Sequence, residues 1–302
     1  MNAANPEKAA QSGDPWDGHS KPFTIGMRPI EEAAWIDINA KLDLHLAEKQ
    51  RLEHLDLSAI FREMPETREA QSEVRELIVA HLVQHCAAIV TPAPNARVIK
   101  HNGMTIPIPD ADPPLLAASR MVQEDLCLMR RSAEGWVLAA AALAFPSSWS
   151  LAEKIGRPLG AIHQPVPGFA GRMDMMVTRI FDNLQVERPV ERFNWSLYDD
   201  PSLHHPRPHG TRHWWAADGT IDPAKVFVRT ERQTLRKLAQ SYDVLFTIKI
   251  RHDALAHYEQ HQRAAMAAEL AALSDSELAY KGLAGERGHI AAVLASAATT
   301  TT

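Results

Sequence analysis

Val226-Phe-Val-Arg-Thr-Glu-Arg-Gln-Thr-Leu235 and Asp243-Val-Leu-Phe-Thr-Ile-Lys-Ile250 are the stretches on which the predicted fold depends. Apolar and polar residues alternate along both well enough to predict a pair of β-strands. Alternation would divide the polar side chains of the first strand between two faces, with Arg229, Glu231 and Gln233 on one and Thr230, Arg232 and Thr234 on the other. We therefore predict a sheet with charged residues near its centre, and the other elements are assigned around this sheet.

Further strands are predicted on the amino-terminal side of this pair. Val98 to Ile106 contains Asn102-Gly103, the strongest short hairpin signal. Asp125–Arg131 and Gly135–Phe145 flank a short polar turn and predict a second hairpin, although the alanine-rich second arm leaves a helix as the alternative. Phe193 to Leu197 is a further strand candidate.

Helices are predicted on both sides of these strands. The stretches with helical apolar spacing or composition are Glu31–Leu55, Arg68–Cys86, a short segment after Ser150, Arg172–Leu184, Ala254–Leu273 and part of Asp275–Ser296. Ser150 and Glu153 have the spacing of a capping box. Helices around a group of antiparallel strands define an α+β fold.

Composition limits the class of protein. The chain has 302 residues with a formal net charge of −5, which argues against a nucleic-acid-binding protein. Its 2 cysteines are far apart and form no zinc or covalent-haem motif. The polar amino terminus and the absence of a long apolar run predict a cytoplasmic protein with no membrane segment. We expect loose tails at residues 1–20 and 291–302, and one domain over residues 21–290.

The charged residues of the Val226–Leu235 stretch have two interpretations. In the first, the stretch is an edge strand whose charges lie in water. In the second, Glu231 or Arg232 lies in a cavity, where a carboxylate would hold an alkylammonium ion or a guanidinium would stabilise bound oxygen. The residue types alone leave both open.

Histidines crowd the loop Leu203-His-His-Pro-Arg-Pro-His-Gly-Thr-Arg-His213, and neutral imidazole is the commonest metal ligand. The loop lacks the helical spacing of H-E-x-x-H, so an exposed polar loop is the favoured interpretation and a metal site the alternative. His163 is different, because it stands alone in the rigid, mostly apolar segment Gly160–Gly168. A single imidazole held in this way suits an axial haem ligand, although simple packing is the commoner reason for such a histidine.

Three other residues are weaker candidates. Glu124, just before the second hairpin, suits a cap or a surface position better than a substrate contact. Asn194 beside Trp195 would combine an amide donor with an aromatic wall, and core packing explains this tryptophan equally well. Cys127, a possible thiolate ligand, is more typical of a small core residue.

Several blocks in a fixed order resemble those of the haem-dependent oxidative N-demethylase family. The blocks are Gly26-Met-Arg-Pro29, Trp35-Ile-Asp-Ile38, Val122-Gln-Glu-Asp-Leu126, Phe145-Pro-Ser-Ser-Trp149, Lys154-Ile-Gly-Arg-Pro-Leu159, Ile162-His-Gln-Pro-Val-Pro167, Arg192-Phe-Asn-Trp195 and Arg229-Thr-Glu-Arg-Gln-Thr-Leu235. The resemblance runs from about Gly26 to Arg251. Lys237-Leu-Ala239 departs from it, since a proline is expected after the leucine.

The resemblance implies a PAS-like antiparallel sheet with a haem b pocket, helical extensions at both ends, and His163 as the proximal ligand of the iron. It also implies that dioxygen binds at the haem and that a small amine like dimethylamine loses a methyl group as formaldehyde. Electrons would come from NADPH through a separate reductase or ferredoxin-like donor.

Residue chemistry on the matching blocks assigns roles to the remaining candidates. Glu231 would hold the amine and Arg232 the iron-bound oxygen, with Glu124 and Asn194 at the pocket wall; alternatively, Arg229 or Arg232 would neutralise a haem propionate. A haem or small-ligand sensor is one alternative function, and a metal hydrolase built on the His204–His213 loop is another.

Overall fold

A computed structural model describes residues 15–16, 21–86, 89–94, 96–208, 210 and 212–296. Most of the two expected tails lies outside these residues. The last helix, α9 (Arg287–Ala295), extends past residue 290, the expected end of the domain. Its Ile290, Val293 and Leu294 side chains are buried in a hydrophobic cluster, which explains why the helix continues past residue 290.

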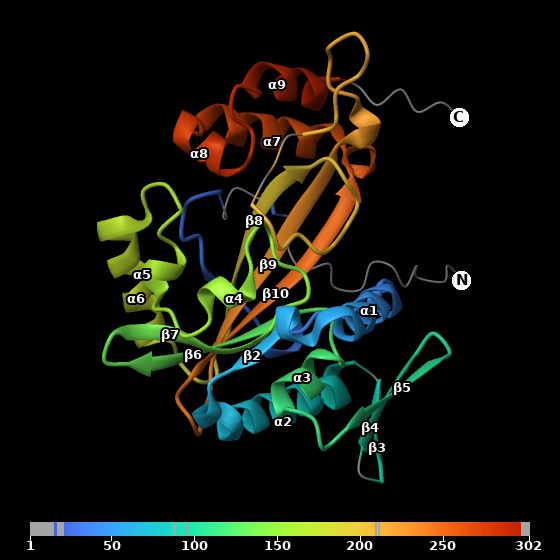
Figure 1. Ribbon diagram of the computed structural model, residues 1–302, viewed down its shortest axis with the longest axis vertical. Helices are drawn as coiled ribbons and strands as arrows, with labels where there is room; N and C mark the ends of the chain where they lie inside the picture. Colours follow the sequence, from blue (N-terminus) through green and yellow to red (C-terminus); the bar gives the residue numbers. More distant parts are fainter. Residues whose placement is uncertain are drawn as a thin grey trace, which may run out of the picture.

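A seven-stranded antiparallel sheet forms the centre of the molecule (Figure 1). Its strands, in spatial order, are β1 (Arg28–Pro29), β8 (Val190–Tyr198), β9 (Phe227–Lys237), β10 (Val244–Ala254), β6 (Asp125–Ser132), β7 (Gly135–Ala142) and β2 (Phe61–Glu63). β9 and β10 are the two stretches with which the prediction began, and they pair along their whole length. The predicted β6–β7 hairpin is also confirmed, so the alanine-rich arm is a strand.

Helices α1 (Leu42–Ile60), α2 (Arg68–His85) and α3 (Pro114–Ser119) belong to the hydrophobic cluster on one face of this sheet, which we call the α1 face. The predicted helix over Glu31–Leu55 is wrong at its start, since only a 3-10 turn occurs at Glu32–Ala34 and α1 begins at Leu42. The reason lies in a neighbouring loop. The side chains of Glu124 and Gln123 accept hydrogen bonds from the backbone amides of Asp37 and Asn39, and hold this segment extended.

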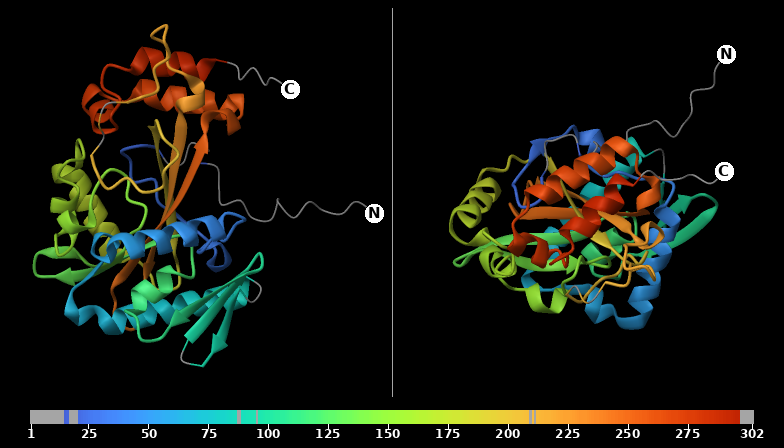
Figure 2. Two further views of the ribbon diagram at one scale, coloured as in Figure 1. Left: turned by 45° about the vertical axis from the view of Figure 1, so that its right-hand side comes forward. Right: turned by 90° about the horizontal axis from the view of Figure 1, so that it is seen from above.

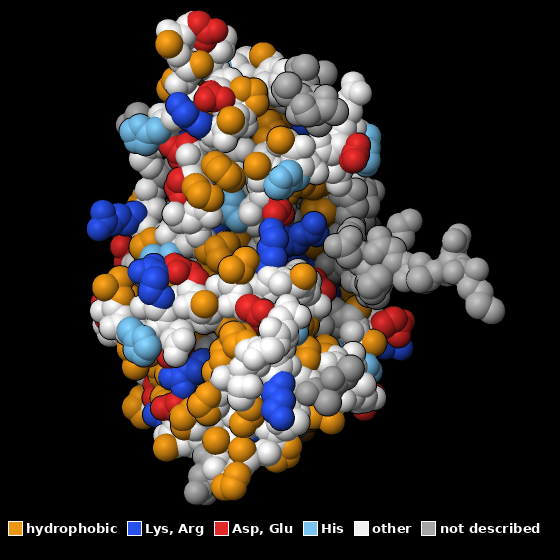
Figure 3. Space-filling view, turned by 90° about the vertical axis from the view of Figure 1, so that its right-hand side faces the viewer, with side chains coloured by type: hydrophobic (Ala, Val, Ile, Leu, Met, Phe, Trp, Pro, Cys, Tyr) orange, Lys and Arg blue, Asp and Glu red, His pale blue; other side chains and the backbone are white. Residues whose placement is uncertain are grey.

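A three-stranded sheet of β3 (Val90–Ala93), β4 (Ala96–His101) and β5 (Met104–Pro109) lies at the same side (Figure 2). The predicted Asn102-Gly103 turn is confirmed, with φ of 46° and 81° at these residues. In Figure 3, which shows the molecule from the right-hand side of Figure 1, hydrophobic side chains gather in the lower part of the surface. The two edge strands carry the exposed prolines Pro92, Pro107 and Pro109, which oppose pairing with further strands because proline has no amide hydrogen.

The opposite face is covered by the segment between β7 and β8, and we call it the α6 face. The segment contains α4 (Leu151–Lys154), α5 (Leu159–Ile162), a π-helical turn (Phe169–Met173) and α6 (Asp174–Asn183). Apolar residues of α5 and α6 pack on Cys127, Leu235 and Ile248 of the sheet. The Ser150 capping box does not form, because its side chain makes no capping hydrogen bond, although the short helix after it is confirmed.

The carboxyl-terminal helices α7 (Gln260–Ala272), α8 (Asp275–Tyr280) and α9 pack on Trp195, Leu197 and Val228, near the end of β8 and the start of β9 (Figure 1). α8 ends beside the outer side of β8, where the Lys281 ammonium donates a hydrogen bond to the Trp195 carbonyl oxygen. Helices α7, α8 and α9 therefore cover one end of the sheet.

Within the described residues, none of the helices combines the length and the apolar character needed to cross a bilayer.

Candidate functional site

His163 lies at the end of α5, in the segment that covers the α6 face. Its ring stacks on Phe169 with 4.4 Å between the ring centres and an interplanar angle of 18°. Nδ1 lies 2.9 Å from the Leu159 carbonyl oxygen. Because a carbonyl oxygen only accepts, Nδ1 carries the hydrogen, and the lone pair of the neutral ring is on Nε2.

The surroundings of His163 keep this ring neutral. Burial, with a smaller effect of the positive charges of Lys154 and Arg192, lowers the pKa of His163 to about 4, although the hydrogen bond to Leu159 acts in the opposite direction. Nε2 makes no hydrogen bond to any described residue. A neutral, oriented imidazole with a free Nε2 is the form that binds a metal ion.

Polar residues of β8 and β9 line the α6 face opposite this segment. Asn194 pairs with Glu231, and Arg192 pairs with Gln233, so these four side chains point to the same face. The Gln233 Nε2 donates a hydrogen bond of 2.7 Å to Oε2 of Glu231. This bond orients the carboxylate, which is only 8% exposed.

Positive charges surround Glu231. Burial lowers the pKa of Lys154 to about 8 and that of Lys281 to about 8, and it also lowers the pKa of Arg192; in all three, the Glu231 charge acts in the opposite direction. Tyr280 is also affected, since burial and the Glu231 charge raise its pKa to about 12. The structure thus brings together Glu231 and Asn194 of the predicted site residues, and it connects His163 to Glu231 through Lys154 and Arg192, whose charges act on both.

Lys154, Arg192 and Lys281 were missed as site residues by sequence reasoning. Lys154 and Arg192 stand in blocks that carry the family resemblance, and this was a usable signal. Lys281 follows β9 by more than forty residues, outside every such block, and only the packing of α8 against β8 brings it to the site.

Arg229 shares this face but has a structural role. Its guanidinium donates hydrogen bonds to the carbonyl oxygens of Phe145 and Leu203 and to the Ser147 hydroxyl. It therefore ties the loop after β7 to the histidine-rich loop, and its charge lies 5.4 Å from the centre of the Tyr198 ring.

Arg232 and Glu124 lie on the α1 face, away from His163. Arg232 donates to Glu191 at 2.7 Å and to the carbonyl oxygens of Trp35 and Ala34. One oxygen of Glu124 accepts from the Asp37 amide; the other is buried without a hydrogen-bond partner in the described chain. The structure does not bring these two residues together with Glu231.

Substitution of Arg232 with methionine should lower the free energy of unfolding by about 3 kcal/mol, because buried Glu191 loses one of its two arginine partners. Urea denaturation would measure the loss, and Arg179→Met, at an exposed position of α6, is the matched control. A loss below about 0.5 kcal/mol, which is ordinary for a surface site, would show that this ion pair does not stabilise the fold.

The histidine-rich loop does not form a metal centre in the described chain. His204 Nδ1 bonds to the Ala144 carbonyl oxygen, His205 Nε2 bonds to the Ser202 carbonyl oxygen, and His213 is exposed. His209 lies outside the described residues. No group of three or more His, Cys, Asp or Glu side chains among the described residues is arranged to hold a metal ion.

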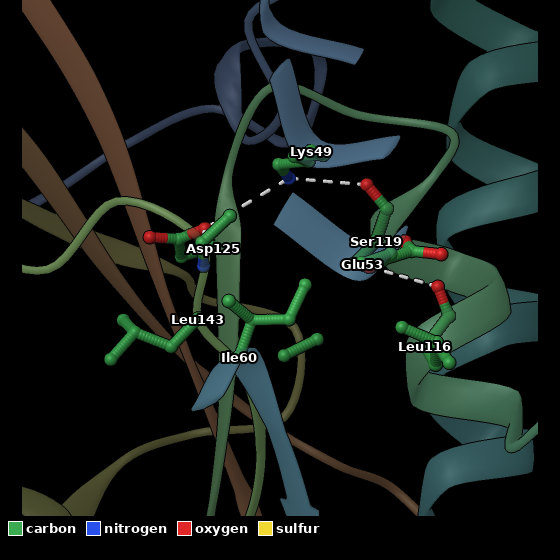
Figure 4. Close-up of a pocket in the computed structure, with 9 residues that line it drawn as sticks. Lys49, Glu53, Ile60, Leu116, Ser119, Asp125 and Leu143 are labelled. Carbon is green, nitrogen blue, oxygen red and sulfur yellow. Dashed lines mark hydrogen bonds and ion pairs between the residues drawn. The ribbon is translucent and has the colours of Figure 1, made fainter. Parts of the chain in front are cut away.

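Two cavities lie outside this site. One, of about 10 Å³, lies between Lys49 and Asp125 (Figure 4) and has room for about one water molecule. The other is an open groove of about 420 Å³ beside Trp136, Lys237 and Tyr242. Neither is lined by His163 or Glu231.

Four histidines, of which His45 and His81 are buried and His163 and His252 half-buried, should make the haem-free protein acid-sensitive. Burial lowers the pKa of His45 and His252 to about 3 and that of His81 and His163 to about 4, from the ordinary 6.5. As the pH falls from 6.5 to 4, the unfolded state binds protons that the folded state excludes. Stability is therefore full above pH 6.5 and falls below it, by about 1.4 kcal/mol per pH unit for each histidine.

Urea midpoints at pH 7.5, 6.5 and 5.5 test this expectation. His45→Leu should reduce the slope of stability against pH below pH 6.5 by the contribution of one histidine, about 1.4 kcal/mol per pH unit. His54→Leu, at an exposed position of α1, should leave this slope unchanged. A midpoint that stays constant down to pH 5 would contradict the burial of neutral imidazoles.

The fold is that of an α+β protein with an antiparallel sheet, and the segment that carries His163 covers a charged face of this sheet. A family model matches residues 26–290, and its description is haem-dependent oxidative N-demethylase, alpha subunit-like. Since this match covers most of the chain, the protein belongs to that family.

Proposed function

We propose that this protein binds haem b through His163 and uses it to remove a methyl group oxidatively from a small alkylamine. The observation that carries the proposal is the state of His163. Its ring is neutral, Nδ1 is bonded to Leu159, and Nε2 has no partner among the described residues. This is the ligand that a haem iron requires.

The topology supports a PAS-like arrangement of the site. If β6 to β10 are numbered 1 to 5 in chain order, they lie in the order 2-1-5-4-3 across the sheet. The helices between strands two and three, which carry His163, cover one face. A flat cofactor held by His163 would therefore lie against that face.

The residues around His163 are of the types that a haem group needs. The imidazole of His163 would provide an axial ligand through Nε2, apolar Phe169 and Ile162 flank it, and half-buried Arg192 has a buried nitrogen, Nε, without a hydrogen-bond partner in the described chain. When bound, haem supplies the iron at which dioxygen is activated. The protein contributes the axial ligand and a site that excludes water.

Glu231 is the residue that we propose for holding the amine. A small alkylamine is protonated at neutral pH, and a carboxylate binds its N–H groups by charge-assisted hydrogen bonds. Gln233 holds Oε2 of Glu231, which leaves Oε1 for the substrate. Asn194, paired with Glu231 across the strands, is placed to contact the same ligand. Arg232 and Glu124 are not included in the proposed site.

The reaction needs electrons from outside this chain. One amine, one dioxygen, two electrons and two protons give the demethylated amine, one formaldehyde and one water. We propose that a separate flavin or iron–sulfur reductase delivers the electrons from NADPH. The words "alpha subunit-like" in the family description agree with a protein that works with other components.

Formaldehyde release tests the proposal. Haem-loaded protein with dimethylamine, NADPH and a generic ferredoxin–reductase pair should form formaldehyde in an amount close to the NADPH consumed above background, and carbon monoxide should stop the reaction. A protein whose haem is reduced and binds carbon monoxide, but which forms no formaldehyde from any methylated amine tested, would support the sensor function instead.

A further inference from the structure

Two half-buried cations on the α6 face, Lys154 and Arg192, have no counterion bonded to them in the described chain. Nε of Arg192 is buried without a hydrogen-bond partner among the described residues, and no other hydrogen bond or ion pair of this side chain occurs there. The Lys154 ammonium lies 4.1 Å from the centre of the Trp149 ring and likewise has no hydrogen bond or ion pair to a described residue.

These cations belong to the His163 site. Both lower the pKa of His163, after the larger effect of its burial, and both interact with the Glu231 carboxylate. Lys281 adds a third positive charge near Glu231, although its ammonium is bonded to Trp195 and Ser196. One carboxylate therefore faces several cations, and positive charge is in excess.

Removing a charge from water without a partner is costly, and a ligand of opposite charge can supply that partner. The excess also opposes the binding of an ammonium ion at Glu231, because the nearby cations repel it. A ligand with negative charge would remove both difficulties. Carboxylates suit arginine and lysine well, since they accept charge-assisted hydrogen bonds from both.

We infer that Lys154 and Arg192 form a carboxylate-binding pair in the His163 site, an inference that rests on the proposed function. The carboxylates have two sources with the same chemistry: the propionates of the haem, or a carboxylate on the methylated amine. In either case the pair balances the charge of the site, so that Glu231 is free to bind an ammonium group.

The two sources can be distinguished with hemin and hemin dimethyl ester, whose propionates carry no charge. Each is titrated into haem-free protein in the same dilute non-ionic detergent, and the Soret band is followed. If the pair binds propionates, the ester should bind the wild-type protein about 100-fold more weakly, as expected for losing charge-assisted bonds. Lys154→Gln and Arg192→Gln should each reduce this preference about tenfold.

If the pair binds a substrate carboxylate, the two porphyrins should bind equally. N-methylglycine should then perturb the spectrum of the loaded protein at concentrations at least tenfold lower than dimethylamine, and the two variants should lose this preference. Arg179→Gln and Lys225→Gln, both at exposed positions, are the matched controls and should behave as wild type in both titrations.

Equal binding of both porphyrins together with no preference for the carboxylated amine would overturn the inference and leave the haem site intact. A wild-type protein that binds neither porphyrin would reject the proposed function, and the inference with it. The wild-type titrations need no substitution, so either negative result holds even if a variant does not fold.

Discussion

His163→Ala is expected to weaken hemin binding on the order of 100-fold or more and to leave the fold intact. The expected loss is large because the substitution removes the only proposed bond between the protein and the iron. The imidazole is half-buried and bonded only to the local Leu159 carbonyl oxygen, so its removal should cost little stability. Soret titration measures the affinity, and circular dichroism checks the fold.

Added imidazole should restore much of the spectrum of this variant, since the small molecule can occupy the space left by the side chain. His213→Ala, at an exposed histidine of the histidine-rich loop, is the matched control and should bind hemin as the wild type does. Wild-type affinity and an unchanged spectrum in His163→Ala would show that another residue binds the iron.

Glu231→Gln should retain haem but lower formaldehyde formation about 100- to 1,000-fold. Glutamine keeps the size of the side chain and can still accept from Gln233, but it cannot pair with an ammonium ion or take its proton. The loss should appear mainly as a higher KM if the carboxylate only holds the amine, and also in kcat if it accepts a proton.

A matched control is Glu187→Gln, at an exposed position between α6 and β8, and it should leave both constants unchanged. Glu231→Gln with wild-type kcat/KM and normal haem content would remove Glu231 from the proposed mechanism.

The strands could be predicted from the sequence wherever a local signal defined them. Alternation predicted β9 and β10, and Asn102-Gly103 predicted the turn between β4 and β5. The start of α1 could not be predicted in this way. Its upstream segment is held extended by Glu124, a residue more than eighty positions away, and helical periodicity contains no information on such a bond.

The candidate site, like the fold, could be predicted from the sequence only where a local pattern defined it. Alternation correctly predicted that Glu231 and Arg232 face opposite sides of β9, but it could not show which side faces His163. The choice depends on where α5 and α6 pack, and the structure places Glu231 on that face and Arg232 on the other. Lys281 directly follows α8 and lies outside every block of the family resemblance, so only the tertiary structure reveals it.

The central claim, that His163 makes this chain a haem protein, is tested most directly by an absorption spectrum of hemin-reconstituted protein before and after dithionite and carbon monoxide. We predict a Soret band that shifts on reduction and again on binding carbon monoxide, without the signature of a thiolate ligand, because Cys127 is buried and its pKa is raised well above its usual range. A protein that stays colourless after reconstitution with hemin would contradict the account.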